Sequence, residues 1–228
     1  MSRHVLTGAG SGIGAALARQ LTERGDGLVL LARDEARREA IAAEFPAAQV
    51  LVADLAEPST LNGIGRLVDG PVDSLVHVAG TVELATVERL RLAEWQHQLD
   101  VNLTSPAVLT REFLPALRAA RGTVVFVNST AGLSVSPEWG AYAASKFGVR
   151  ALADAVRAEE RVHGLRVTTV FPSRTATPMQ KKVHAQEGKD YRPEDWIAAS
   201  SVADTVRYVL DLPRDATLEE ITVRPGPR

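Results

Sequence analysis

The fold of this chain is indicated most clearly by the stretch Thr7-Gly8-Ala9-Gly10-Ser11-Gly12-Ile13-Gly14. It places four glycines within seven residues, directly after a short apolar strand that contains Val5 and Leu6. Apolar residues then recur at helical spacing at Ile13, Leu17 and Leu21. Glycine permits the tight turn and the close approach of a pyrophosphate to the backbone, and the helix N-terminus presents free N–H groups to the phosphates. The pattern predicts a dinucleotide-binding βα unit, although the literal Gly-x-Gly-x-x-Gly spacing is absent. The alternative is a loop-to-helix junction without a ligand, which so dense a glycine cluster disfavours.

The rest of the chain alternates between strand-like and helical segments at intervals typical of βαβ units. Unbroken apolar runs at 28–31 and 124–127 indicate strands that are covered on both faces. We therefore predict an α/β fold: a Rossmann-type, doubly wound parallel sheet of about seven strands with helices on both faces, in a single domain over residues 1–228. The expected strands are 3–7, 27–32, 49–53, 72–78, 122–128, 165–171 and 219–224. The expected helices are 12–24, 34–44, 58–67, 93–119, 141–162 and 198–211.

Three polar residues in the second half of the chain form a candidate catalytic set. Tyr142 and Lys146 are four residues apart on an expected helix, so the phenol and the ammonium project from one face. Ser129 lies thirteen residues before Tyr142, at the end of an apolar strand. A tyrosine exchanges a proton with a carbonyl oxygen most readily when its pKa is close to neutral, and a nearby ammonium favours the phenolate. For each residue alone a structural role is the simpler interpretation; the combination points to proton transfer.

The glycine turn together with these three residues resembles the short-chain dehydrogenase/reductase family. Further landmarks of that family follow in order along nearly the whole chain: Asp54-Leu55, Ala79-Gly80, Asn102 and the segment from Pro172 to Thr177. The resemblance implies a catalytic tetrad of Ser129, Tyr142, Lys146 and Asn102. It also implies a cofactor site made of Gly8, Gly10, Ser11, Gly12, Ile13, Gly14, Arg33, Asp54, Leu55, Ala79, Gly80, Tyr142, Lys146, Pro172, Thr175 and Thr177.

The resemblance also assigns a role to each residue of the tetrad. Tyr142 would be the general acid/base, Ser129 would orient the substrate oxygen, and Lys146 would hold the nicotinamide ribose and lower the tyrosine pKa. Asn102 would support a water that connects Lys146 to solvent.

The chain departs from the family pattern at four positions. His77 and Val78 stand where the family has two asparagines, Ser173 replaces a glycine, and Asn128 occupies the place of a frequent serine. None of these changes removes a proton-transfer group.

The end of the second strand bears on the choice of cofactor. An acidic residue there selects NAD by binding the ribose hydroxyls, but this chain has Ala32 at that position, followed by Arg33 and Asp34. The Arg33 guanidinium is suited to bind a 2′-phosphate. NADP(H) is therefore the preferred cofactor. NAD(H) is the alternative if Asp34 turns inward, and Arg33 could also be an ordinary solvated cation.

Composition argues against several other classes of protein. The net charge of −2 gives no reason to expect nucleic acid as a partner, and the absence of cysteine excludes disulfides and thiolate metal sites. The five histidines show no metal-ligand spacing, so no metal is predicted. The chain runs directly into its first strand and has no apolar stretch near twenty residues, so we expect no signal peptide, no membrane segment and a cytoplasmic location.

Residues 173–196 form the longest stretch expected to be irregular, and its place after the sixth strand suggests a substrate lid. Trp139 and Trp196 are candidates for lining a substrate pocket, with ordinary packing as the alternative. The expected helices 104–119 and 141–162 carry apolar residues that in the resembled family form a homodimer or homotetramer interface; cover within the monomer is the alternative.

The sequence therefore predicts an NADP(H)-dependent oxidoreductase that acts on a small carbonyl or secondary alcohol. An NAD-dependent alcohol dehydrogenase with the same residues is one alternative. A dinucleotide-sensing regulatory protein without turnover is another.

Overall fold

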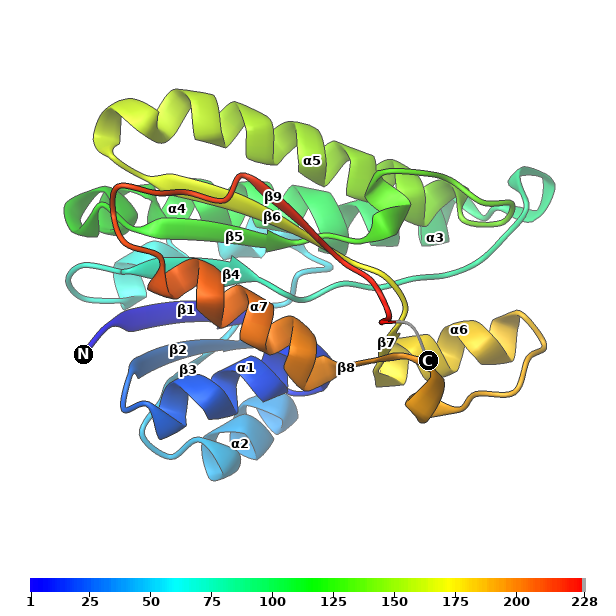
Figure 1. Ribbon diagram of the computed structural model, residues 1–228, viewed down its shortest axis with the longest axis horizontal. Helices are drawn as coiled ribbons and strands as arrows, with labels where there is room; N and C mark the ends of the chain where they lie inside the picture. Colours follow the sequence, from blue (N-terminus) through cyan, green and yellow to red (C-terminus); the bar gives the residue numbers. More distant parts are fainter. Residues whose placement is uncertain (227–228) are drawn as a thin grey trace.

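The structure is a computed structural model that describes residues 1–226, and within them seven parallel strands form one central sheet (Figure 1). The strands are β1 (Arg3–Thr7), β2 (Gly27–Ala32), β3 (Gln49–Val52), β4 (Ser74–His77), β5 (Thr123–Val127), β6 (Arg166–Pro172) and β9 (Glu220–Val223). Their order across the sheet is β3-β2-β1-β4-β5-β6-β9. The order reverses between β1 and β4, and ligands bind at the carboxyl ends of the strands at such a switch point. The prediction of a doubly wound parallel sheet is confirmed.

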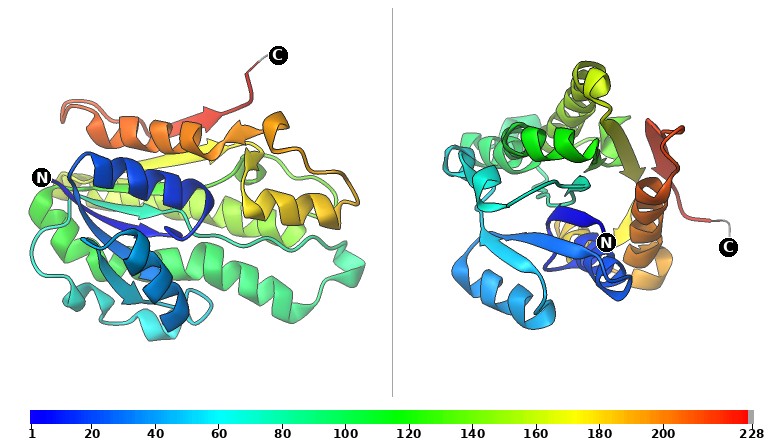
Figure 2. Two further views of the ribbon diagram at one scale, coloured as in Figure 1. Left: turned by 90° about the horizontal axis from the view of Figure 1, so that it is seen from below. Right: turned by 90° about the vertical axis from the view of Figure 1, so that its left-hand side faces the viewer.

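Helices cover both faces of the sheet (Figures 1 and 2). They are α1 (Gly12–Glu23), α2 (Glu35–Glu44), α3 (Leu92–Leu99), α4 (Ser105–Ala120), α5 (Gly140–Glu160), α6 (Pro178–Gln186) and α7 (Ala199–Asp211). Successive residues of a strand point to opposite faces, so each strand supplies two cores. Val5 of β1 packs with the residues of α4 and α5, whereas Leu6 packs with those of α1 and α7. The two cores hold the strands in register, and the site is built at the carboxyl edge of the sheet.

The apolar residues on which we based an expected oligomer interface lie inside the monomer. Leu109, Phe113 and Leu117 of α4 are fully buried, and Val149 and Val156 of α5 belong to the same core. Leu152 of α5 is only partly buried against this core, and the other five residues provide no contact surface for a second copy. The expectation of a homodimer or homotetramer stays a prediction and has no support from this set.

Two expected helices are wrong in detail. Residues 58–67 form two 3₁₀ turns (Pro58–Leu61 and Ile64–Leu67) in place of one helix, because Gly63 between them has φ 84°. The expected helix 93–119 is divided by a π-helical turn at Asp100–Thr104, which connects α3 to α4. π-Turns of this kind occur mostly within α-helices and often at functional sites.

The segment 173–196 is more ordered than expected. It contains the short strand β7 (Thr175–Ala176), which pairs with β8 (Ile197–Ala198), and the helix α6. The Thr177 hydroxyl accepts a hydrogen bond from the Gln180 N–H at 3.2 Å and caps α6, while proline follows at the first helical position. Val183 and His184 on α6 are buried. Both cap signals are present in the sequence, so the irregular assignment was a misinterpretation of a capped helix.

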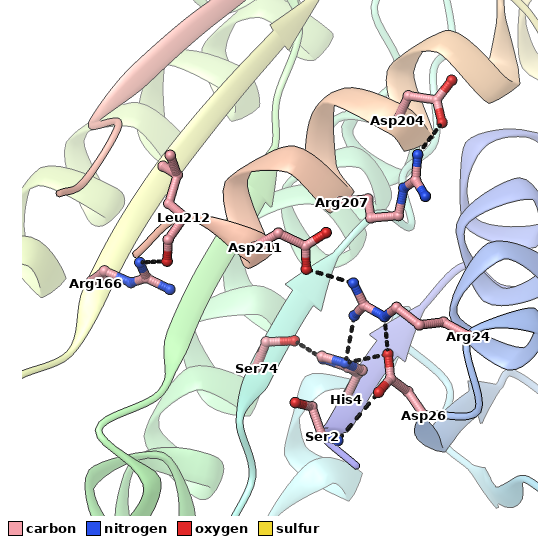
Figure 3. Close-up of polar contacts among 10 residues, drawn as sticks. All are labelled: Ser2, His4, Arg24, Asp26, Ser74, Arg166, Asp204, Arg207, Asp211 and Leu212. Carbon is pink, nitrogen blue, oxygen red and sulfur yellow. Dashed lines mark hydrogen bonds and ion pairs between the residues drawn. The ribbon is translucent and has the colours of Figure 1, made fainter. Parts of the chain in front are cut away.

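A polar cluster fastens the amino edge of the sheet (Figure 3). The His4 ring on β1 lies 2.7 Å from the Ser74 hydroxyl on β4 and 3.3 Å from the Asp26 carboxylate before β2. Arg24 joins Asp26 to Asp211 at the end of α7, with both distances at 2.5 Å. The Ser-His-Asp composition is that of a hydrolase triad, but Ser74 is only 1% exposed and lies at the edge opposite the glycine turn. The cluster is therefore a structural tie between four elements.

Candidate active site

The glycine turn closes tightly over the carboxyl end of β1. Gly8 and Gly12 have φ values of 74° and 55°, in the left-handed region that favours glycine. A Cβ at Gly14 would lie 2.2 Å from the Gly8 carbonyl oxygen, so α1 packs directly on the turn. A Cβ at Gly8 would lie 2.8 Å from the Ala79 backbone nitrogen after β4. The glycines therefore provide the bare backbone surface against which a pyrophosphate fits.

The N-terminus of α1 is open toward the same space. Within the described chain, the Ser11 side chain makes no capping hydrogen bond, and no acidic residue occupies the first helical turn. The first backbone N–H groups of the helix and its positive dipole end are consequently available to an anion. This arrangement fits the phosphates of a dinucleotide.

The predicted catalytic residues converge beyond the end of β5. Ser129 follows this strand directly, and Tyr142 and Lys146 lie in the first two turns of α5. The Tyr142 hydroxyl is hydrogen-bonded to the Ser129 side chain. The Lys146 ammonium lies 5.7 Å from the centre of the Tyr142 ring and donates to the Val127 carbonyl oxygen at 3.3 Å. A ligand oxygen that reaches the Tyr142 hydroxyl therefore also meets Ser129.

The acidity of the tyrosine differs from expectation. Burial raises the pKa of Tyr142 to about 12, and the hydrogen bond from Ser129 opposes this shift only in part. Burial likewise lowers the pKa of Lys146 to about 8. The expected lowering of the tyrosine pKa by Lys146 is wrong for these positions, because the ammonium lies over the ring and bonds to the backbone. The phenol is protonated at neutral pH, which is the form that donates a proton to a carbonyl oxygen.

Two buried asparagines brace these residues. Asn102 lies in the π-turn; its amide accepts from the Thr81 N–H at 2.8 Å, donates to the Thr81 carbonyl oxygen at 2.9 Å, and donates to the Ser145 hydroxyl at 3.0 Å. Asn128 donates to the Lys146 carbonyl oxygen at 3.0 Å and accepts from the Ser129 N–H at 2.8 Å. Sequence reasoning treated Asn128 only as a replaced serine. Its amide in fact joins the end of β5 to the first turns of α5.

The converging residues line one cleft of about 940 Å³ along the carboxyl edge of the sheet. Every predicted cofactor residue lines it, as do Ser129, Tyr142 and Lys146. Among the predicted site residues only Asn102 does not line the cleft; it lies behind Gly80, where its side-chain oxygen is 3.2 Å from the position of an added Cβ.

One end of the cleft carries a cationic pair. Arg33 is largely exposed, and its Nε donates to the Asp34 carboxylate at 2.9 Å. Asp34 also caps α2, because its other oxygen accepts from the Arg37 N–H at 2.7 Å. Arg37 lines the cleft too, and its guanidinium contacts the Gly10 carbonyl oxygen at 3.5 Å. Sequence reasoning missed Arg37, although its place in the first turn of the helix that follows Arg33 could have revealed it.

His77 lies beneath the site at the end of β4. Its Nε2 is 3.0 Å from the Thr110 hydroxyl, its ring stacks on Phe126 at 4.9 Å, and its Nδ1 has no partner among the described residues. Burial, with a smaller contribution from the charge of Lys146, lowers the pKa of His77 to about 3. Burial also lowers the pKa of His4.

These shifts predict acid sensitivity. An unfolded histidine binds a proton near its ordinary pKa of 6.5, whereas folded His77 stays neutral until the pH approaches 3. Stability is complete above 6.5 and falls as the pH decreases through this window, by about 1.4 kcal/mol per pH unit for this residue. Urea unfolding at about pH 7.5 and about pH 5 measures the effect. The variant His77→Leu should show the smaller loss between these two values, and an equal loss would contradict the assignment.

Comparison with known protein families identifies the family of this chain. Residues 3–188 match the model described as short chain dehydrogenase. The chain belongs to the short-chain dehydrogenase family. As a short-chain dehydrogenase it is an oxidoreductase with a nucleotide-binding Rossmann fold.

Individual relatives agree with this membership. An uncharacterized oxidoreductase of Staphylococcus epidermidis is 29% identical over 226 residues, which cover 97% of this chain and 96% of that protein. The glycine betaine reductase of Emericella nidulans is 34% identical over 233 residues, which cover 97% of this chain but only 18% of that protein.

Two solved structures superpose closely on this chain. An alcohol dehydrogenase from the archaeon Thermococcus sibiricus, complexed with 5-hydroxy-NADP, has a TM-score of 0.88 and 27% identity, covering 100% of this chain and 99% of that one. The actinorhodin polyketide ketoreductase with NADPH has a TM-score of 0.87 and 25% identity, covering 98% of this chain and 95% of that one.

Two further features are missing from the described residues. None of the helices within residues 1–226 has the length and apolar character needed to cross a membrane. No three histidine, aspartate or glutamate side chains in that part of the chain are grouped so as to hold a metal ion.

Proposed function

We propose that this short-chain dehydrogenase reduces a carbonyl compound with NADPH, or oxidises the corresponding secondary alcohol, with Tyr142 as the general acid/base. The observation that carries the proposal is the hydrogen-bonded pair of Tyr142 and Ser129, which opens into the same cleft as the glycine turn and Lys146. When bound, the dinucleotide supplies or accepts the hydride. A regulator that only sensed the dinucleotide would need the glycine turn but not the proton-transfer pair.

The chain's own residues divide the remaining work. Ser129 orients the substrate oxygen and stabilises the charge that develops on it. Tyr142 donates its proton to that oxygen in reduction and takes a proton back in oxidation. Lys146 holds the cofactor ribose and returns a proton from solvent through a water supported by Asn102, whose side chain braces the loop after β4 at Thr81. Asp54, Leu55, Ala79 and Gly80 form the walls that receive the adenosine and ribose.

NADP(H) is the proposed cofactor because of the cationic end of the cleft. Both carboxylate oxygens of Asp34 are already occupied, one by the Arg37 N–H and the other by Arg33 Nε. Ribose hydroxyls that bound to Asp34 would compete with these bonds for its carboxylate. Arg33 and Arg37 leave this end with one excess positive charge, which suits a 2′-phosphate. The structures of the Thermococcus sibiricus alcohol dehydrogenase and the polyketide ketoreductase hold NADP-type cofactors, in agreement with this choice.

The cofactor assignment predicts a selective loss of NADPH affinity. Arg33→Ala and Arg37→Ala should each weaken NADPH binding roughly tenfold to hundredfold, because each removes a charge-assisted contact worth about 1.5–3 kcal/mol. NADH binding should change by less than about twofold, since NADH lacks the 2′-phosphate. Tryptophan fluorescence and calorimetric titration with both nucleotides measure the effect.

The matched control is Arg38→Ala. Arg38 lies on the same helix, pairs with Glu35 and does not line the cleft. Its removal should leave both affinities unchanged. Tighter binding of NADH than of NADPH by the parent would move the assignment to an NAD-dependent alcohol dehydrogenase, and binding of neither would refute the enzyme function.

A further inference from the structure

One arginine joins three separate segments at the end of the cleft that faces Tyr142. Arg174 follows β6, and its guanidinium lies 5.7 Å from the centre of one Trp139 ring and 5.5 Å from that of the Trp196 ring. Trp139 precedes α5, whereas Trp196 lies beyond α6. Cation–π contacts at these distances are attractive, and a guanidinium stacks on indole better than an ammonium does. Arg174 is thus held between Trp139, just before α5, and Trp196, at the far end of segment 173–196.

The same guanidinium is paired with α6 itself. Arg174 donates two hydrogen bonds to the Glu187 carboxylate at the end of this helix, at 2.9 and 2.5 Å. Arg174 and the less effective partner Lys189, at 3.3 Å, hold the pKa of Glu187 below its usual range. The Glu187 side chain is only 10% exposed, and bidentate pairs that are shielded from water are stronger than exposed ones. This pair fastens the C-terminal end of α6.

The part of the cleft next to the Tyr142 phenol, which we call the chamber, has apolar walls. Val82 and Val183 pack on Tyr142, and Trp139 and Met179 are partly buried against the same group. Trp139 also meets the Tyr142 ring edge-on at 5.7 Å. The chamber wall therefore offers hydrocarbon and indole surface to the groups on either side of a substrate carbonyl.

The charges at the outer rim of this chamber cancel, while Lys146 lies deeper in the cleft and donates to the Val127 carbonyl oxygen. Arg174 and Lys189 line the cleft with Glu138 and Glu187, which gives two cations and two anions. Arg174 has both nitrogens Nη1 and Nη2 on Glu187 and its faces toward the two indoles. A substrate carboxylate would compete with Glu187 for the Arg174 guanidinium and would lie close to that shielded anion, which costs free energy.

From this geometry we infer that Arg174 fastens α6 across the chamber and determines specificity, so that the site accepts uncharged carbonyl compounds with an apolar body and rejects anionic ones. The inference rests on the proposed carbonyl reduction for its substrate class. Arg174 acts as a positioning residue and takes no part in proton transfer.

Matched substrate pairs test the specificity. Aryl methyl ketones and their para-carboxylate analogues differ by one charge, and the parent should show a kcat/KM roughly a hundredfold higher for the neutral member, as expected when an unpaired charge must be buried. Glu187→Gln leaves Arg174 without its anion and should raise kcat/KM for the carboxylate analogues roughly tenfold. The double variant Arg174→Met with Glu187→Gln should lose this gain. A parent that prefers the carboxylate member, or a Glu187→Gln variant without the gain, would overturn the inference.

Hydrogen exchange tests the fastening without any turnover. Arg174→Met keeps a long apolar stem between the indoles but removes the ion pair, so the backbone amides of residues 178–189 should exchange roughly tenfold faster. Arg207→Met is the control, since Arg207 pairs with Asp204 on α7 and does not line the cleft. Unchanged exchange in Arg174→Met would overturn the fastening.

The two measurements also separate the proposals. If the parent reduces no carbonyl compound with either nucleotide, the proposed function fails, and the substrate class fails with it. The exchange experiment still decides whether Arg174 holds α6.

Discussion

Replacement of Tyr142 by phenylalanine should lower kcat at least about a thousandfold, because it removes the group that exchanges a proton with the substrate oxygen. Burial keeps the phenol protonated at neutral pH, with a pKa of about 12, so the parent is ready to donate in the reductive direction. The phenylalanine ring keeps the contacts with Trp139 and the valines of the chamber. NADPH affinity should therefore change by less than about threefold, because the phenylalanine ring keeps the surface that Tyr142 contributes to the cofactor site and only the hydroxyl is lost.

Steady-state kinetics with a neutral ketone, together with NADPH titration, checks this split between chemistry and binding. Tyr208→Phe is the control, since Tyr208 is exposed on α7 and does not line the cleft. A Tyr142→Phe variant that reduces substrate at the parent rate would refute the mechanism. A variant that loses turnover and NADPH binding together would instead indicate a structural role for the phenol.

Gly14→Ala is expected to damage both the fold and the cofactor site. The new Cβ would lie 2.2 Å from the Gly8 carbonyl oxygen and 3.1 Å from the Ala9 nitrogen, and neither backbone atom can yield without moving the turn. We expect a loss of about 3 kcal/mol in the free energy of unfolding, at the upper end of the cost of overpacking. The displaced turn should also weaken NADPH binding at least about a hundredfold, because its N–H groups would no longer point at the phosphates.

Urea unfolding and NADPH titration measure the two effects. Gly27→Ala is the matched control: it also adds one methyl group to a glycine of the Rossmann unit, but its Cβ would lie 3.7 Å from the Ser2 carbonyl oxygen, an ordinary contact. Its stability and its NADPH affinity should remain close to those of the parent. Parent-like stability and affinity in Gly14→Ala would mean that α1 does not pack on the turn as described.

Much of the candidate site could be predicted because its signals are local. The glycine turn, the Tyr142–Lys146 spacing and the end of β5 at Ser129 each depend on a few neighbouring residues, and the parallel sheet then brings their carboxyl ends to one edge. The capped start of α6 was local as well, and we misread it because charged residues obscured a short helix with Thr177 as its cap.

Other features could not be predicted because they depend on contacts between distant segments. The same apolar spacing on α4 and α5 describes an oligomer interface or a monomer core, and only packing shows that Phe113 and Val149 lie in the core. The sign of the tyrosine pKa shift follows from the depth of burial and from the direction in which the Lys146 ammonium points. The sequence contains both residues but shows neither the burial depth of Tyr142 nor the direction of the Lys146 ammonium.

The fold class, the family and the residues proposed for proton transfer could all be inferred from the chain without its tertiary structure. Periodicity and turn chemistry act over a few residues, so they are legible in a single sequence. Three other features are visible only in the tertiary structure. The Asp34 carboxylate accepts hydrogen bonds from Arg33 Nε and the Arg37 N–H, and the Arg37 side chain lines the cationic end of the cleft. Arg174 contacts Trp139, Trp196 and Glu187. The burial and the charge pairing of a side chain depend on contacts between residues far apart in the sequence, and these contacts form only when the whole chain folds.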